Sequence, residues 1–188
     1  MRATVYPSFC GGAVIVPPSK SMAHRAIICA CLADGVSTVR RVSESDDMRA
    51  TIGAMEALGA KIERKGDTLT IHGTGGVPRL SSCEVDCIES GSTLRFLIPL
   101  FSLTGGLVTY CGRGRLMERP QDVYAALFKE QGACFLQEDG VIRQHGALKG
   151  GKLVIRGDVS SQFITGLLFT LPLLDGDSVI EILPPFES

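Results

Sequence analysis

Apolar and polar positions along the chain define two kinds of helix-length segment, separated by short β-like runs. Residues 19–35, 89–106 and 160–176 each contain a helix-length stretch that is apolar on nearly every side. Residues 46–58 and 121–130 instead carry apolar side chains near the 3.6-residue period of a half-exposed helix. We therefore expect three buried inner helices and two outer helices.

An internal repeat accounts for this alternation. Residues 56–73 and 129–146 match each other, including a Gly-Ala pair and a closing His-Gly pair. Each unit opens with a β-like run, which is followed by a Ser/Gly turn and an inner helix. These opening runs are residues 13–16, 84–88 and 152–155. The pattern predicts an α/β fold of three βαβαββ repeats with buried inner helices and outer sheets, covering about 13–80, 81–150 and 151–188, the third incomplete.

Equivalent turns would place the N-termini of the three inner helices at one end of the molecule. A helix N-terminus exposes unpaired N–H groups and the positive end of the helix dipole, so three together would attract an anion. The turn residues are small or hydrogen-bonding: Ser19-Lys20-Ser21, Glu89-Ser90-Gly91-Ser92 and Ser160-Ser161-Gln162. Serine is also the commonest helix cap, which needs no ligand. Lys20 and Arg25 favour the ligand, because burying a cation without a partner costs several kcal/mol.

An arginine-rich turn precedes the second outer helix, in the stretch GRGRLMERP, residues 112–120. The forked guanidinium group of arginine suits phosphate and carboxylate ligands. Glu118 could instead pair with Arg115 or Arg119, so a structural role remains open for both, and more so for Arg119.

Composition limits the possible partners. The chain has 188 residues, of which 45% are hydrophobic, and a net charge of −1, so it lacks the basic excess of a nucleic-acid-binding protein. Its longest apolar runs are too short to cross a bilayer, so we expect no membrane contact. Seven cysteines without metal-site spacing predict reduced thiols in a cytoplasmic protein and no bound metal.

Four ordered motifs resemble those of the 5-enolpyruvylshikimate-3-phosphate (EPSP) synthase family, the 3-phosphoshikimate 1-carboxyvinyltransferases. They are PPSKSMAHR, ESGSTLRF, GRGRLMERP and DVSSQFITGLL, and the match runs through nearly the whole chain. The resemblance implies one domain of the two-domain enolpyruvyl transferase fold, an inverse α/β barrel. Residues 1–12 would then form a strand belonging to the absent second domain, and residues 13–188 the substrate-binding domain of an N-terminal portion.

The resemblance also implies a reaction. Family members transfer the enolpyruvyl group of phosphoenolpyruvate to the 5-hydroxyl of shikimate 3-phosphate and release phosphate, with no metal or organic cofactor. The expected partners are these two substrates and the second domain, in a monomeric enzyme. The family's acidic catalysts come from that second domain, so we expect this chain to be inactive alone.

Roles for individual residues follow from the same resemblance. Lys20 would lie between the substrates as the catalytic residue of this portion. The residues expected to bind shikimate 3-phosphate are Lys20, Ser21, Arg25, Ser160, Ser161 and Gln162. Those expected to bind phosphoenolpyruvate are Lys20, Gly91, Arg115 and Gln162.

Three positions depart from the family motifs. His24 and Glu89 stand where asparagine is usual, and Phe96 replaces a proline. Glu89 would oppose phosphate binding unless it is paired or turned away. Phe96 would alter the packing of the inner helix and, with it, the response to glyphosate, which the family binds in the phosphoenolpyruvate site.

Two other functions stay open. A related enolpyruvyl transferase acts on UDP-N-acetylglucosamine, but it usually carries a Lys-Asn pair where this chain has Lys20-Ser21. A non-catalytic anion-binding module is the second alternative, although its third repeat would then be incomplete.

Overall fold

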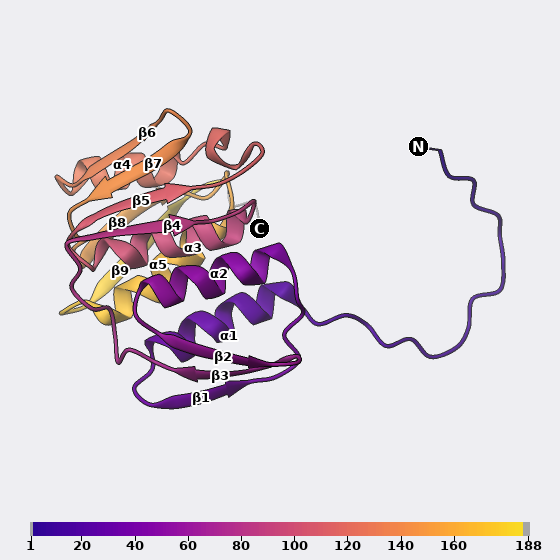
Figure 1. Ribbon diagram of the computed structural model, residues 1–188. Coiled ribbons are helices and arrows are strands. Elements are labelled where there is room, and N and C mark those ends of the chain that lie inside the picture. Colours follow the sequence, from indigo (N-terminus) through magenta and orange to yellow (C-terminus); the bar gives the residue numbers. More distant parts are fainter. Residues whose placement is uncertain (1, 186–188) are drawn as a thin grey trace.

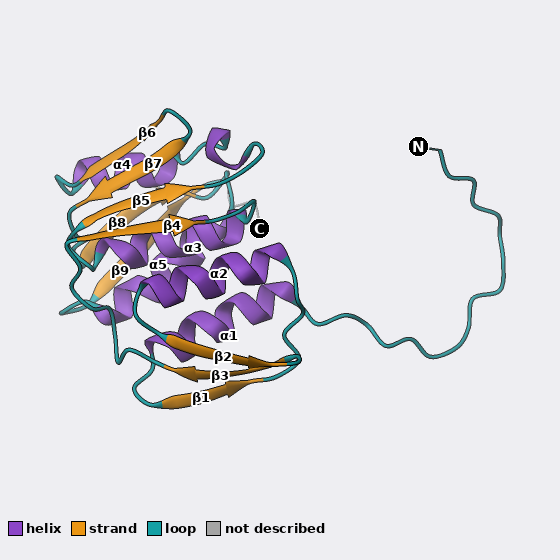
Figure 2. Cartoon of the chain, in the orientation of Figure 1, coloured by secondary structure: helices purple, strands orange, loops and turns teal. Residues whose placement is uncertain are grey.

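A computed structural model describes residues 2–185, and it places the helices between three small sheets (Figures 1 and 2). The sheets lie on the outside, and α1, α2, α3 and α5 run side by side between them. The α/β architecture built from repeated units, predicted from the sequence, is therefore confirmed.

The second unit is a complete βαβαββ repeat. It comprises β4 (Ser82–Asp86), α3 (Gly91–Ser102), β5 (Leu107–Cys111), α4 (Asp122–Glu130), β6 (Cys134–Glu138) and β7 (Val141–His145). A short 3-10 turn, η1 (Leu116–Glu118), precedes α4. The strands run in the order β4-β5-β7-β6, with β4 and β5 parallel and the other pairs antiparallel.

The first unit repeats this arrangement without its opening strand. It comprises α1 (Lys20–Leu32), β1 (Val36–Val39), α2 (Asp46–Ala57), β2 (Lys61–Lys65) and β3 (Thr68–His72), in the sheet order β1-β3-β2. Val36 of β1 pairs with His72, just as Leu107 of β5 pairs with His145. The two sheets thus share one register.

The strand predicted over residues 13–16 is not formed. Val14 and Ile15 are exposed, and the segment before α1 leads away from the sheets instead of running back along β1 (Figure 1). An apolar run becomes a strand only when a neighbouring strand supplies its hydrogen bonds. The same extended segment includes residues 2–12, for which the structure assigns no strand; Met1 lies outside the described residues.

The third unit contains β8 (Gly151–Arg156), α5 (Ser161–Thr170), the 3-10 turn η2 (Leu171–Leu173) and β9 (Ser178–Leu183). β8 and β9 are parallel, as β4 and β5 are. Residues 186–188 of this predicted unit lie outside the described residues.

Only one of the inner helices is apolar and buried all round. α3 lies between α2 and α5, and nine of its residues are buried, from Thr93 to Ser102 with the exception of Arg95. α1 and α5 each keep an exposed side, marked by Met22 and Leu168. α1 packs against α2, and α5 packs against α3, but each also has a side exposed to solvent. The prediction of full burial is therefore wrong for α1 and α5.

The contact between α3 and α5 is close enough to require a glycine. A methyl group on Gly166 would lie 2.5 Å from the carbonyl oxygen of Arg95 and 2.4 Å from the hydroxyl oxygen of Tyr124. That hydroxyl lies 2.6 Å from the same Arg95 oxygen and 3.0 Å from the Phe163 oxygen. One tyrosine of α4 thus joins both inner helices at the point where they meet.

We expect Gly166→Ala to lower the free energy of unfolding by about 1–3 kcal/mol, because the added methyl must push the helices apart. Gly53→Ala on α2 is the matched control, since a methyl there meets nothing within 4 Å. It should instead raise stability by about 0.5–1 kcal/mol through helix propensity. Urea denaturation of both variants measures these changes, and equal stabilities for the two would contradict the close contact.

Candidate anion-binding site

Three serines cap the inner helices, at the positions that the turn sequences predict. The side chain of Ser19 accepts a hydrogen bond from the Met22 N–H at 3.3 Å. Ser90 accepts one from Thr93 at 3.2 Å, and Ser160 accepts one from Gln162 at 3.3 Å. Other N–H groups of each first turn remain available.

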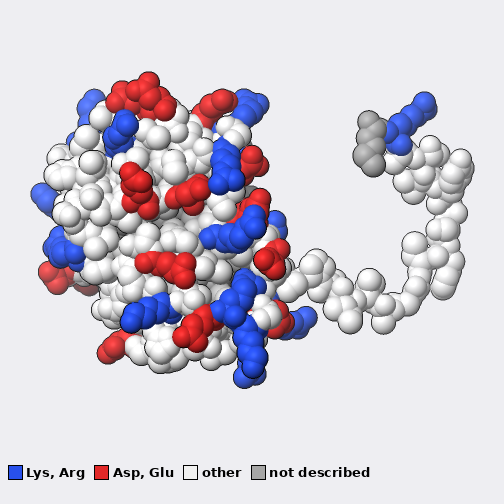
Figure 3. Space-filling view, viewed as in Figure 1, with Lys and Arg blue, Asp and Glu red and all other residues white. Residues whose placement is uncertain are grey.

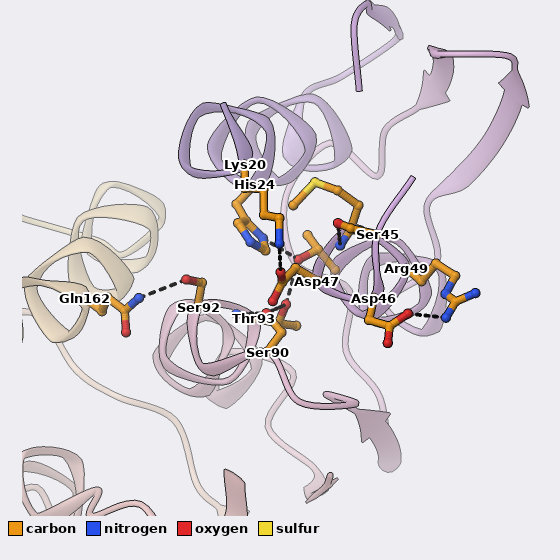
Figure 4. A network of polar contacts seen from close by, with 12 residues as sticks. Lys20, His24, Ser45, Asp46, Asp47, Arg49, Ser90, Ser92, Thr93 and Gln162 are labelled. Atoms are coloured by element: carbon orange, nitrogen blue, oxygen red, sulfur yellow. Dashed lines mark hydrogen bonds and ion pairs between the residues drawn. The ribbon is translucent and has the colours of Figure 1, made fainter. Parts of the chain in front are cut away.

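Side-chain contacts bring the three capped ends together. Arg25 of α1 donates to the Thr165 hydroxyl of α5 at 3.3 Å. Gln162 of α5 donates to the Ser92 hydroxyl of α3 at 2.8 Å (Figure 4). The predicted convergence of the inner helix N-termini is therefore present in the structure, and it gathers Lys20, Ser21, Arg25, Gly91 and Gln162 at one end.

Lys20 differs from the expectation of a buried, unpaired cation. Its ammonium group lies 2.7 Å from a carboxylate oxygen of Asp47, and 57% of its side chain is exposed. The hydrogen bond that Lys20 donates to Asp47, together with the Asp47 charge, raises the pKa of Lys20. Sequence reasoning missed Asp47, although its place in the first turn of an outer helix after a Ser45 cap offered a signal.

Arg25 has no carboxylate partner among the described residues. It is half-buried, and it donates to both the backbone oxygen and the hydroxyl of Ser21 at 2.8 Å. Its guanidinium carbon lies 5.1 Å from the centre of the Phe96 ring. A half-buried guanidinium held by neutral groups retains its full charge for an anionic ligand.

Gln162 is held by a second arginine that sequence reasoning did not single out. Arg95 of α3 donates to the Gln162 side-chain oxygen at 3.1 Å and lies over the Phe163 ring. Burial, followed by the neighbouring charge of Arg119, lowers the pKa of Arg95. Arg95 fixes which end of the amide is the donor, so that the amide nitrogen is directed to Ser92.

The arginine turn forms one of the two pairings that the sequence left open. Glu118 pairs with Arg115, at 3.1 Å, and not with Arg119; the Arg115 side chain is 89% exposed. The guanidinium of Arg119 instead lies over the start of α3, where a methyl group on Gly91 would be 2.9 Å from one of its nitrogens. The described structure therefore brings Arg119, and not Arg115, to Gly91.

Glu89 is the first of the three positions that depart from the family motifs, and Phe96 is the second. A methyl group on Gly114 would lie 2.6 Å from a Glu89 oxygen, so this exposed carboxylate is directed toward the arginine turn. Phe96 is buried and packs edge-on against His24 and Phe169. Phe96 thus lies beneath Arg25 and supports one wall of the site.

His24 is buried, and its ring nitrogen Nδ1 lies 2.7 Å from the Thr51 hydroxyl oxygen. Burial lowers the pKa of His24 to about 4; the charge of Asp47 opposes this shift, while Arg25 and Lys20 add to it. The imidazole is therefore neutral at pH 7.

Metal binding and membrane spanning are the other two properties on which the sequence gives a prediction. No three His, Cys, Asp or Glu side chains among residues 2–185 are grouped so that they could hold a metal ion. Within the same residues, every helix is too short or too polar to cross a membrane. On the face that Figure 3 shows, basic side chains are interspersed with acidic ones.

The family model of EPSP synthase (3-phosphoshikimate 1-carboxyvinyltransferase) matches residues 7–185. The chain belongs to this family. The 3-phosphoshikimate 1-carboxyvinyltransferase of Clostridium beijerinckii is 50% identical over 192 residues, a match that covers 98% of this chain and 44% of that protein. The Clostridium perfringens (strain 13) protein of the same name is 44% identical, with coverage of 100% and 45%.

A solved structure of the EPSP synthase from Acinetobacter baumannii resembles the described fold. The TM-score is 0.78 at 27% identity, and the match covers 94% of this chain and 41% of that one. The chain thus spans less than half the length of the relatives it matches, and the match confirms that its fold is one part of the larger EPSP synthase fold.

We expect the stability of this chain to fall as the pH drops from about 6.5 to 4. The folded pKa of His24 lies below its unfolded value, so the unfolded state binds a proton first and is favoured in this window. The loss is about 3 kcal/mol if the full shift is realised. His24→Asn, which keeps a hydrogen-bond donor, should reduce this pH dependence in urea denaturation at several pH values; an unchanged slope would contradict the buried neutral imidazole.

Proposed function

We propose that this chain provides the shikimate 3-phosphate half-site, and one side of the phosphoenolpyruvate site, of a 3-phosphoshikimate 1-carboxyvinyltransferase. The observation that carries the proposal is the convergence of three serine-capped helix N-termini around Arg25, a cation with no carboxylate partner among the described residues. The names of the matched relatives support the same reaction.

Shikimate 3-phosphate carries two anionic groups, and two places at this end suit them. Its phosphate would bind at the N-terminus of α5, where Ser160 and Ser161 offer hydroxyl and backbone donors. Its carboxylate would bind Arg25 and Ser21, which already contact each other at 2.8 Å. Gln162 would hydrogen-bond to the bound ring from between these two places.

Phosphoenolpyruvate would bind beside it, at the N-termini of α1 and α3. Lys20 would lie between the substrates, stabilise negative charge and assist proton transfer near the attacking hydroxyl. Gly91 would allow the phosphate to approach the backbone. Arg115 would bind this phosphate after leaving Glu118, and Arg119 offers a second guanidinium that is already placed at Gly91.

The reaction itself needs groups that we assign to a second domain. Forming the tetrahedral ketal requires a proton to be delivered to the methylene carbon of phosphoenolpyruvate and one to be removed from the 5-hydroxyl. Residues 13–188 would form the substrate-binding domain, and residues 1–12 would pair with that second domain. We propose a monomeric cytoplasmic enzyme, since cysteines without disulfides in the described residues favour a reducing compartment.

An NMR titration of this chain with shikimate 3-phosphate tests the half-site, with unphosphorylated shikimate and UDP-N-acetylglucosamine as controls. We expect selective shifts at Ser21, Arg25 and residues 160–162. Arg25→Ala should weaken binding about tenfold or more, because it removes charge-assisted hydrogen bonds.

Lys129→Ala is the control, because it also removes one positive charge. Lys129 is exposed and lies in the last turn of α4. Its affinity should match that of the unchanged chain. Equal weakening by both variants would mean that general charge attraction, and not a built site, holds the ligand.

We also expect the chain alone to release no phosphate from the two substrates, because we assign the acidic groups that complete the proton transfers to a second domain. A coupled phosphate assay with both substrates checks this. Phosphate release that depends on both would contradict the assignment of the acidic catalysts to a second domain.

A further inference from the structure

Six polar residues on three helices are paired in a way that closes a ring. Each helix contributes two residues about one turn apart: Lys20 and His24 on α1, Asp47 and Thr51 on α2, and Ser90 and Thr93 on α3. Figure 4 labels all of these except Thr51. Of these six, His24, Thr51, Ser90 and Thr93 are buried. The ring therefore runs from the exposed end of the site into the core and back.

The inner half of the ring consists of three short hydrogen bonds. His24 Nδ1 lies 2.7 Å from Thr51 Oγ1, and Thr51 Oγ1 lies 2.7 Å from Thr93 Oγ1. Thr93 Oγ1 donates to Ser90 Oγ at 2.8 Å. The outer half is the 2.7 Å ion pair of Lys20 with Asp47.

Counting protons gives these hydrogen bonds one direction. A hydroxyl has a single proton, and that of Thr93 is donated to Ser90. Thr51 must then donate to Thr93, which leaves no proton for His24. His24 must therefore donate to Thr51, so its proton lies on Nδ1. A neutral imidazole carries only one such proton, and Nε2 is then without one.

Ser90 ends the directed chain, and it affects the ionisation of Asp47. The Ser90 hydroxyl accepts from Thr93, and Lys20 first and Ser90 second hold the pKa of Asp47 below its ordinary value. The buried chain also fixes the helix that carries Asp47, because Thr51, one turn further along α2, is bonded to His24 of α1 and to Thr93 of α3.

We infer that this ring is a positioning device for Lys20, in which Asp47 is the residue that holds the ammonium group and the buried chain from His24 to Ser90 holds Asp47. The inference rests on the proposed function, since that function gives Lys20 its role between the substrates. Helix capping alone explains the contact of Ser90 with Thr93, but it requires neither Thr51 nor His24. A long lysine side chain is otherwise free to take many rotamers, and the ring removes that freedom before a ligand arrives.

The tautomer of His24 tests the buried half of the ring without any ligand. In the ¹⁵N spectrum of the imidazole we expect the proton on Nδ1 in the unchanged chain. Thr51→Ser keeps the hydroxyl and should keep that tautomer. Thr51→Val has nearly the same shape without the hydroxyl, and it should shift the proton toward Nε2. A proton on Nε2 in the unchanged chain, or no difference between the two variants, would overturn the directed chain.

The ionisation of Lys20 tests the outer half. Asp47→Asn removes the partner charge and should lower the pKa of Lys20, followed by the ¹³C shift of its terminal methylene carbon. Asp46→Asn is the matched control, because this neighbour has only a small effect on Lys20 and pairs with Arg49. Equal effects of the two variants on the Lys20 pKa would overturn the role of Asp47.

Both measurements are made without substrate, so their failure is distinct from failure of the proposed function. If shikimate 3-phosphate caused no shifts while the His24 tautomer and the Lys20 pKa behaved as expected, the ring would stand and the proposed ligand would be wrong. If shikimate 3-phosphate shifted the expected residues while the His24 proton lay on Nε2, the proposed function would stand and the ring would be wrong.

Discussion

The placement of α3 between α2 and α5 is the constraint on which the rest of the structure depends. α3 is buried along most of its length, and Gly166 lets α5 approach it until a methyl group would no longer fit. Because α1, α3 and α5 begin at equivalent points of three repeats, this packing also aligns their capped N-termini. The end that we propose as the anion-binding site is therefore a consequence of how the core is packed.

The charges at that end follow two different rules. Lys20 is neutralised by Asp47, whereas Arg25 is held by a hydroxyl, a carbonyl and the face of Phe96. The first cation is held in position by an ion pair, and the second keeps its charge available for a ligand. A site that must accept anions, yet fold before they bind, needs both arrangements.

Much of the fold was predictable from the sequence because the repeat imposes a shared register. The caps Ser19, Ser90 and Ser160 could be located from turn residues ahead of apolar helices. The missing strand at residues 13–16 could not be foreseen, since strand formation depends on pairing and not on apolar character alone. The pairing of Glu118 with Arg115 was one of two open alternatives, and only the path of the turn decided between them. Asp47 and Arg95 were missed because they act through contacts between helices far apart in sequence.

A crystal structure of this chain with shikimate 3-phosphate would test the central claim most directly. The account predicts that the phosphate binds within hydrogen-bonding distance of Ser160 and Ser161, and that the carboxylate binds Arg25. A phosphate bound at another surface, with the N-terminus of α5 left unoccupied at saturating ligand, would contradict it.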